Sequence, residues 1–171
     1  YYTPSILVDA ILPYIPTEAK VWCPFDTENS EFVRAFKQRG NPVTYSHIKD
    51  GFDFFEYEPT DYDYIVSNPP FTKKLRVLER LYSLNKPFAM LLPLPMLNYQ
   101  EIGNFFIGRQ VELLIVDKKV SFNGNTSSFN SSYFCSGVLP RELIFHGLEH
   151  NNSNKFYTPS RMYEDMVDFE V

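Results

Sequence analysis

An apolar strand pattern that runs directly into an amide and two prolines is the stretch of the sequence best suited to chemistry. Apart from Asp63, residues 62–66 are aromatic or β-branched and predict a buried strand, and Asn68-Pro69-Pro70-Phe71 follows it. Neither proline has an amide hydrogen and both have a fixed φ, so regular strand pairing must end there. The motif is therefore held rigidly at the carboxyl end of a strand, which is the edge where open α/β sheets bind ligands.

This arrangement suits methyl transfer to a planar amide-like or aryl amine, whose nitrogen is a poor nucleophile because its lone pair is delocalised. The Asn68 side-chain oxygen and the Pro69 carbonyl can accept the amine hydrogens, which localises the lone pair in the transition state. No strong base is required, because the proton becomes acidic only as the methyl group arrives. Phe71 would stack on the substrate ring and hold it in line with the donor. A turn without chemistry is the alternative.

Strand patterns alternate with helical patterns along the rest of the chain, which predicts an α/β fold. A strand, a helix and a second strand within about 30 residues form a parallel βαβ unit near the start. The wholly apolar run at 88–92 is typical of a strand in the middle of a parallel sheet. Helices are expected to begin near residues 5, 31, 75 and 100, and strands are expected at 20–24, 43–48, 62–66, 88–92, 111–116, 132–135 and 142–145.

Length and charge limit what the chain can be. Its 171 residues predict one domain, placed at 1–148, with a polar and then acidic tail at 149–171 that is expected to be partly ordered or to pack as a short helix near 162–167. The net charge of −5 argues against a free-standing duplex binder, because phosphate contacts dominate such affinity. Basic residues nevertheless cluster after the proline motif and at 118–119, which indicates either nucleic-acid contact or a solvated helix face. The first cluster is Lys73, Lys74, Arg76 and Arg80.

The cysteines and histidines have no spacing typical of a disulfide framework or a metal site. Cys23 and Cys135 are expected to be free thiols of an intracellular, cytoplasmic protein. His47, His146 and His150 form no recognisable ligand set, so no metal is expected. No apolar run approaches the ~20 residues of a membrane span and no signal peptide opens the sequence, so no membrane partner is expected.

The Asn-Pro-Pro-Phe motif after an apolar strand resembles the catalytic motif of S-adenosylmethionine-dependent amino-methyltransferases, particularly DNA adenine-N6 methyltransferases. The chain looks most like the compact single-domain members carried by bacteriophages, which would place it in the host cytoplasm. The resemblance implies a Rossmann-like class I methyltransferase fold with a seven-stranded, largely parallel sheet, helices on both faces and an antiparallel last strand. It also implies S-adenosylmethionine as cofactor, adenine N6 in DNA as substrate, and Asn68, Pro69, Pro70 and Phe71 as catalytic residues.

The same resemblance implies a set of cofactor contacts. Tyr2-Thr3-Pro4 is similar to the aromatic-Thr-Pro motif that contacts the cofactor in this family. The loop after the first strand aligns with Asp-Pro-Phe-x-Gly-x-Gly, but Cys23 replaces the acid before Pro24 and the glycines, which let a backbone approach a ligand closely, are absent. Asp26 is therefore expected to supply the carboxylate for the ammonium of the methionine moiety.

Adenine and ribose contacts are implied further along the chain. Asp53 and Phe54 match the family position that binds the cofactor adenine, although core packing of these aromatics is the alternative. The acid that binds the ribose is missing, and His47 or Asp50 would replace it. A polar loop at 121–132, expected to be mobile, precedes a strand whose Tyr133 or Phe134 would contact the target base or, alternatively, pack in the core.

Other functions share the same nitrogen chemistry. Enzymes that methylate RNA adenines or protein glutamine amides also use Asn-Pro-Pro with an aromatic residue. A degenerate methyltransferase fold that acts as a phage binding or inhibitory module is the non-enzyme alternative, which the missing glycines favour. A separate recognition domain of ~100 residues is not expected in a chain of this length, so target selectivity would be low, or would come from loops, a partner protein or a homodimer.

Overall fold

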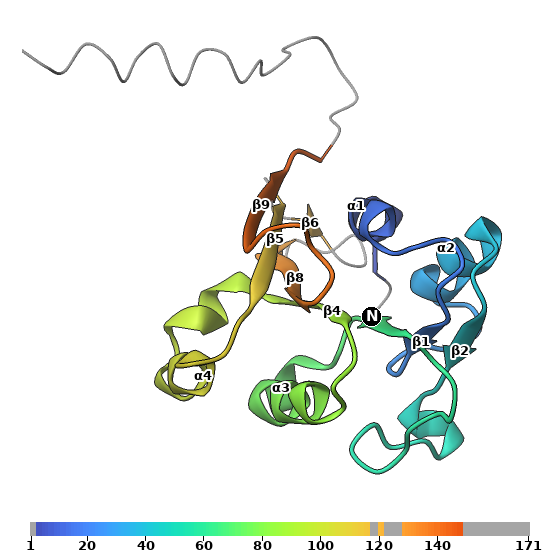
Figure 1. Cartoon of the computed structure of the whole chain (residues 1–171), viewed down its shortest axis with the longest axis horizontal. Helices are drawn as coiled ribbons and strands as arrows, with labels where there is room; N and C mark the ends of the chain where they lie inside the picture. Colours follow the sequence, from blue (N-terminus) through green and yellow to red (C-terminus); the bar gives the residue numbers. More distant parts are fainter. Residues whose placement is uncertain (1–2, 117–119, 122–127, 149–171) are drawn as a thin grey trace, which may run out of the picture.

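The computed structural model describes residues 3–116, 120–121 and 128–148. Its centre is a seven-stranded sheet with the order β2-β1-β3-β4-β8-β5-β9, which contains every strand that the sequence predicted (Figure 1). The strands are β1 (Val21–Cys23), β2 (Val43–Tyr45), β3 (Tyr64–Ser67), β4 (Phe88–Pro93), β5 (Glu112–Val116), β8 (Ser131–Ser136) and β9 (Leu143–His146). A separate pair, β6 (Val120–Ser121) and β7 (Ser128–Phe129), lies within the region expected to be a loop.

Helices cover both faces of the sheet. In Figure 1, α1 and α2 lie on one side and α3 and α4 on the other. The α-helices are α1 (Ser5–Ile11), α2 (Glu31–Arg39), α3 (Lys74–Ser83) and α4 (Gln100–Phe106), and short 3₁₀ helices are η1 (Leu12–Tyr14), η2 (Ile48–Asp50), η3 (Phe71–Lys73) and η4 (Leu94–Asn98). The ends of α2 follow the sequence signals, because Ser30 is its N-cap and Gly40, with φ of 92°, is its left-handed C-cap.

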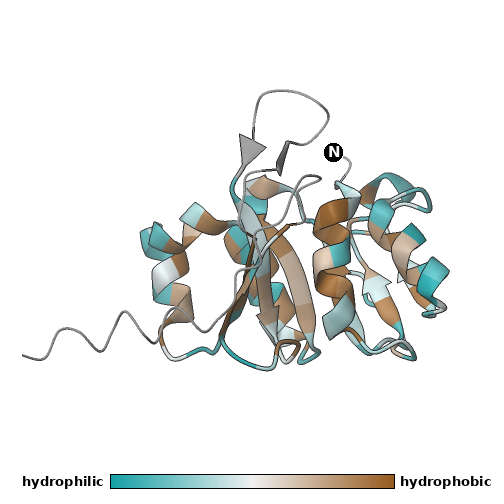
Figure 2. Ribbon diagram, turned by 90° about the horizontal axis from the view of Figure 1, so that it is seen from above, coloured by the Kyte–Doolittle hydropathy of each residue, from teal (hydrophilic) through white to brown (hydrophobic). Residues whose placement is uncertain are grey.

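The alternation of side chains along the strands divides the core into two layers. Brown, hydrophobic residues follow the central strands and α1 in Figure 2, whereas the outer helices carry teal, hydrophilic residues. Successive strand residues point to opposite faces of a sheet, so one strand supplies both layers. The layer under α1 and α2 includes Val21, Cys23, Val66, Leu91, Leu114 and Tyr133, and the layer under α3 and α4 includes Trp22, Ile65, Phe88, Met90 and Phe134.

One feature of the expected sheet is wrong: the antiparallel strand is not the last strand. β8 runs antiparallel to both β4 and β5, whereas the last strand, β9, is parallel to β5. The chain leaves β5 at the carboxyl edge of the sheet and begins β8 at that same edge, so β8 must run backwards. β8 then ends at the amino edge, and β9 starts from there in the common direction.

Glu112 fixes the turn between these last two strands. Its carboxylate accepts hydrogen bonds from the backbone N–H groups of Gly137, Val138 and Leu139, at 2.9, 2.9 and 2.7 Å. Gly137 has φ of 69°, a conformation that L side chains rarely adopt. The turn therefore has a carboxylate anchor on β5, which explains why β9 passes to the far side of that strand.

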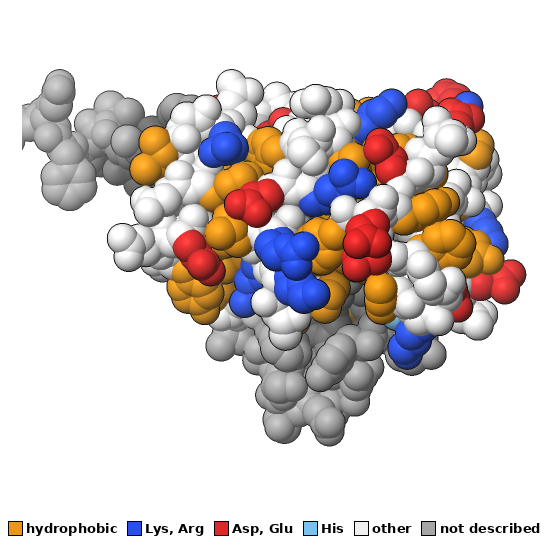
Figure 3. All heavy atoms as spheres, turned by 90° about the horizontal axis from the view of Figure 1, so that it is seen from below, with side chains coloured by type: hydrophobic (Ala, Val, Ile, Leu, Met, Phe, Trp, Pro, Cys, Tyr) orange, Lys and Arg blue, Asp and Glu red, His pale blue; other side chains and the backbone are white. Residues whose placement is uncertain are grey.

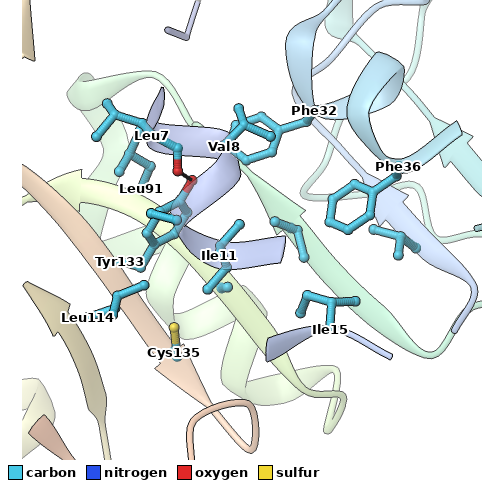
Figure 4. Close-up of a cluster of buried hydrophobic side chains, with 14 of the residues drawn as sticks. Leu7, Val8, Ile11, Ile15, Phe32, Phe36, Leu91, Leu114, Tyr133 and Cys135 are labelled. Atoms are coloured by element: carbon cyan, nitrogen blue, oxygen red, sulfur yellow. Dashed lines mark hydrogen bonds between the residues drawn. The ribbon is translucent and has the colours of Figure 1, made fainter. Parts of the chain in front are cut away.

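Tyr133 joins the middle of the sheet to the first helix. Its ring is fully buried and its Oη donates a hydrogen bond to the Leu7 carbonyl at 2.7 Å, drawn as the dashed line in Figure 4. Burial raises the pKa of this phenol well above its usual value, so it remains a donor over the working pH range. The contact brings α1, and with it Thr3, against the sheet.

We expect Tyr133→Phe to lower the free energy of unfolding by about 1 kcal/mol, because a buried neutral hydrogen bond contributes about that much. Urea unfolding followed by circular dichroism measures the change. Tyr45→Phe, at a ring that is 37% exposed, is the control and should change stability by a few tenths of a kcal/mol at most. Equal stability of Tyr133→Phe and the wild type would contradict this role for the hydroxyl.

Candidate active site at the carboxyl edge of the sheet

β3 ends where the prolines require it to end. The β3–β4 ladder stops at the pair Ser67–Met90, although β4 itself continues to Pro93. Pro69 is buried, and Pro70 is exposed and is the N-cap of η3. Asn68 therefore leaves the ladder at the carboxyl edge of the sheet, where the sequence placed it, and its side chain is available for contacts outside the sheet.

Asn68 joins the proline motif to the start of the chain. Its Nδ2 donates a hydrogen bond of 3.0 Å to Oγ1 of Thr3, a residue 65 positions away that is 9% exposed. With the amide held in this orientation, Oδ1 is buried, and no group in the described part of the chain donates a hydrogen bond to it. A buried carbonyl oxygen without a donor is costly, so this atom is poised to receive an N–H from a bound molecule.

Ser67 connects the same motif to the loop after β1. Its hydroxyl donates to Oδ2 of Asp26 and accepts the backbone N–H of Phe25 at 3.3 Å. Asp26 in turn donates its own N–H to the Ser46 carbonyl, beyond the end of β2, at 3.2 Å. Sequence reasoning missed Ser67, although a hydroxyl between an apolar strand and the catalytic amide is a signal that was there to be found.

Asp26 is an acid in a neutral environment. It is 7% exposed, and burial raises its pKa to about 6, although hydrogen bonds from Ser67 and Ser30 act in the opposite direction. Within the described residues the ion pair is Lys20–Asp61, so no lysine or arginine there pairs with Asp26. A buried carboxylate that lacks a cation is suited to an ammonium ligand. Cys23 cannot act as this acid, because burial raises its pKa well above the usual value and keeps the thiol neutral.

Other expected cofactor residues lie around this loop. His47 follows Ser46 and is half-buried, and its Nδ1 accepts the Lys49 N–H at 3.0 Å. Asp53 is half-buried, and its Oδ1 accepts the Phe55 N–H at 2.9 Å in a local turn. Phe54 is 3% exposed, and its ring centroid lies 4.8 Å from that of Phe25. The Asp53–Phe54 turn therefore packs against the loop that carries Asp26.

Tyr133 and Phe134 are not brought to this site. Both are fully buried, and they point to opposite faces of the sheet, where they belong to the two core layers. They pack in the core, which was the alternative to contact with the target base, because β8 is an inner strand that is covered on both faces. Pro4, Pro24 and Phe71 do lie in the segments that form the site: Pro4 is the N-cap of α1, Pro24 follows β1 and is buried, and Phe71 is half-buried.

Several expectations concern residues outside the described part of the chain, namely Tyr2, His150, the lysines at 118–119, residues 122–127 of the polar loop and the tail at 149–171. The division into a domain and a tail therefore stays a prediction. Among the described residues, no group of three or more His, Cys, Asp or Glu side chains could hold a metal ion. No helix there is long and apolar enough to cross a membrane.

No protein-family model matches the sequence, and no curated protein matches it either. Solved structures do match. A predicted O-methyltransferase from Agrobacterium tumefaciens has a TM-score of 0.53 at 9% identity, with 96% of this chain and 95% of that chain covered. A proposed class I S-adenosylmethionine-dependent methyltransferase from Listeria monocytogenes has a TM-score of 0.50 at 11% identity, with 95% and 67% covered.

The third match is the modification subunit of a proposed type I restriction enzyme from Vibrio vulnificus, with a TM-score of 0.50 at 12% identity. It covers 98% of this chain but 52% of the subunit, so this chain spans about half of that protein. The three matches and the strand order show that the chain has the Rossmann-like fold of class I methyltransferases. The fold class predicted from the sequence is confirmed.

Asp26→Asn should stabilise the free protein above pH 6. The folded-state pKa of about 6 exceeds the unfolded value of 3.8, so the wild type loses stability as the pH rises between these values and does not regain it above them. The uncharged variant avoids this loss. We expect its free energy of unfolding to be higher by about 3 kcal/mol at pH 8, with little difference near pH 4.

Urea unfolding at the two pH values measures this difference. Asp9→Asn, at an exposed position of α1, is the matched control and should change stability little at either pH. Destabilisation of Asp26→Asn at pH 8 would show that the charged carboxylate supports the fold, and would contradict the interpretation of Asp26 as a site for a cation.

Proposed function

We propose that this chain transfers a methyl group from S-adenosylmethionine to the exocyclic N6 amine of adenine in DNA. The observation that carries the proposal is the unpartnered Oδ1 of Asn68, buried at the end of β3 and oriented by Thr3. Adenine N6 is an aryl amine with two N–H donors, so it supplies the hydrogen bond that this oxygen lacks. The restriction-modification subunit among the structural matches supports a nucleic-acid substrate.

The proposed mechanism assigns a role to each residue of the motif. Asn68 Oδ1 and the Pro69 carbonyl accept the two N6 hydrogens, which draws the nitrogen lone pair out of conjugation with the ring and aims it at the donor. Pro70 keeps the backbone rigid, and Phe71 stacks on the adenine and fixes its plane. S-adenosylmethionine, when bound, supplies an electrophilic methyl group, so the neutral amine needs no strong base.

The loop after β1 has a negative charge that complements the positively charged donor. Asp26 offers a buried carboxylate to the ammonium of the methionine moiety, and Asp53 lies in the turn packed on the same loop. The absence of glycine between Cys23 and Ser30 is the departure from the family, and it is the specific feature that favours a second candidate. That candidate is a methyltransferase fold that has lost its donor and acts as a binding or inhibitory module.

Asn68→Ala should abolish methyl transfer while it leaves donor binding nearly unchanged, because the amide is proposed to contact the acceptor nitrogen and not the donor. Calorimetric titration with S-adenosylmethionine measures binding, and mass spectrometry of N6-methyladenine in digested single-stranded and duplex DNA measures transfer. Asn104→Ala, at an exposed position of α4, is the matched control. Undiminished transfer by Asn68→Ala would refute the mechanism. No donor binding by the wild type at millimolar concentration would favour the binding module.

Thr3→Val should lower the rate of transfer by roughly tenfold or more, because the isosteric side chain removes the acceptor that orients the Asn68 amide. Thr3→Ser keeps the hydroxyl and should restore most of the rate. The loss should fall on kcat rather than on the affinity for the donor, which single-turnover measurements and calorimetry separate. Equal rates for the Val and Ser variants would show that Thr3 only packs.

A further inference from the structure

A group of cations and aromatic rings borders the proposed active site on the side of α3 and α4. The Arg76 guanidinium carbon lies 4.2 Å and the Lys73 Nζ 5.6 Å from the ring centroid of Phe55. The Lys74 Nζ lies 5.7 Å from the ring centroid of Tyr99. We call these five residues the cationic rim. The three cations of the rim follow the catalytic motif closely in sequence, because Lys73 is two residues after Phe71.

The two rings of the rim differ in what they leave exposed. Phe55 is half-buried, holds two cations and packs on Phe54, with ring centroids 5.6 Å apart. Tyr99 is 51% exposed and stands just before α4, after the carboxyl end of β4. Phe55 therefore serves to position Lys73 and Arg76, whereas Tyr99 presents an open ring next to a positive charge.

The charges of the rim have no acidic partners. Within the part of the chain that the structure describes, the ion pair is Lys20–Asp61, on other elements. The first turn of α3 contains no acidic residue, although a helix start disfavours cations, so Lys73 and Lys74 stand where their charge costs stability. Figure 3 shows Lys and Arg side chains near the middle of this face, with Asp and Glu side chains among them. An anionic partner would offset that cost.

We propose that the cationic rim binds single-stranded nucleic acid, with Tyr99 stacked on an unpaired base and Lys73, Lys74 and Arg76 on the phosphates. The proposal rests on the proposed function and deepens it, because it names the form of the substrate. An exposed aromatic ring beside cations is the combination that binds single strands, since every base has a face on which to stack.

A duplex fits this surface less well. Its bases are already stacked on one another, so Tyr99 would gain no partner unless a base were flipped out at a cost of a few kcal/mol. Three cations on a chain with a net charge of −5 also neutralise few phosphates. An acidic protein would satisfy the cations but would leave the tyrosine ring without a stacking partner.

Fluorescence anisotropy with a labelled, adenine-containing DNA single strand of about 16 nucleotides tests the proposal without the donor. Tyr99→Ala should weaken binding by about tenfold. Lys73→Ala combined with Lys74→Ala should weaken it and reduce the slope of log affinity against log salt by about 1.4, at about 0.7 per phosphate contact. Lys37→Ala is the matched control, because Lys37 Nζ also lies over a ring, that of Tyr45 at 5.2 Å, but on α2.

The outcomes separate the rim from the chemistry. The proposal is supported if the rim variants bind the single strand more weakly, while the Lys37→Ala control binds normally and the melting temperatures of all variants equal that of the wild type. This result supports the proposal whether or not methyl transfer is observed. If the wild type transfers methyl groups but the rim variants bind the single strand normally, the proposed role of the rim is refuted and the proposed function stands. Equal affinity for a duplex of the same sequence, or equally strong competition by poly-L-glutamate, would also overturn it.

Discussion

The prolines after β3 impose the constraint on which the site depends. Because Pro69 and Pro70 have no amide hydrogen, β3 cannot follow β4 beyond Ser67, even though β4 continues to Pro93. Two consecutive polar residues therefore stand at the carboxyl edge of the sheet: Ser67, the last residue of the ladder, and Asn68, the first residue beyond it. Ser67 bonds the loop after β1, and Asn68 bonds Thr3, two residues before the start of α1. Three segments far apart in the sequence meet at one point through these two side chains.

That meeting point is stabilised less well than the core around it. Asp26 is buried without a cation, and the Asn68 oxygen is buried without a donor, while the surrounding strands are packed on both faces. Both groups would be better satisfied by a bound molecule, one by a positive charge and the other by an N–H. A fold commonly sacrifices stability in this way where it must bind and orient a ligand.

The strands and helices were predictable because their signals are local. Apolar runs marked all seven strands of the sheet, and the Ser30 and Gly40 caps marked the ends of α2. The direction of β8 was not predictable from such signals. It depends on the edge of the sheet at which the chain enters, and on the Glu112 carboxylate that anchors the turn before β9, a contact across 25 to 27 positions.

The sequence by itself determined which residues carry chemistry and where β3 must stop, because both follow from side-chain type and from the geometry of proline. Tertiary structure alone decided which of them meet: Thr3 orients Asn68, and Ser67 rather than a glycine holds the β1 loop. It also placed Tyr133 and Phe134 in the core and left Tyr99 exposed, although all three are aromatic residues. Exposure and hydrogen-bond partners depend on what packs above a residue, and neighbours in the sequence do not specify that.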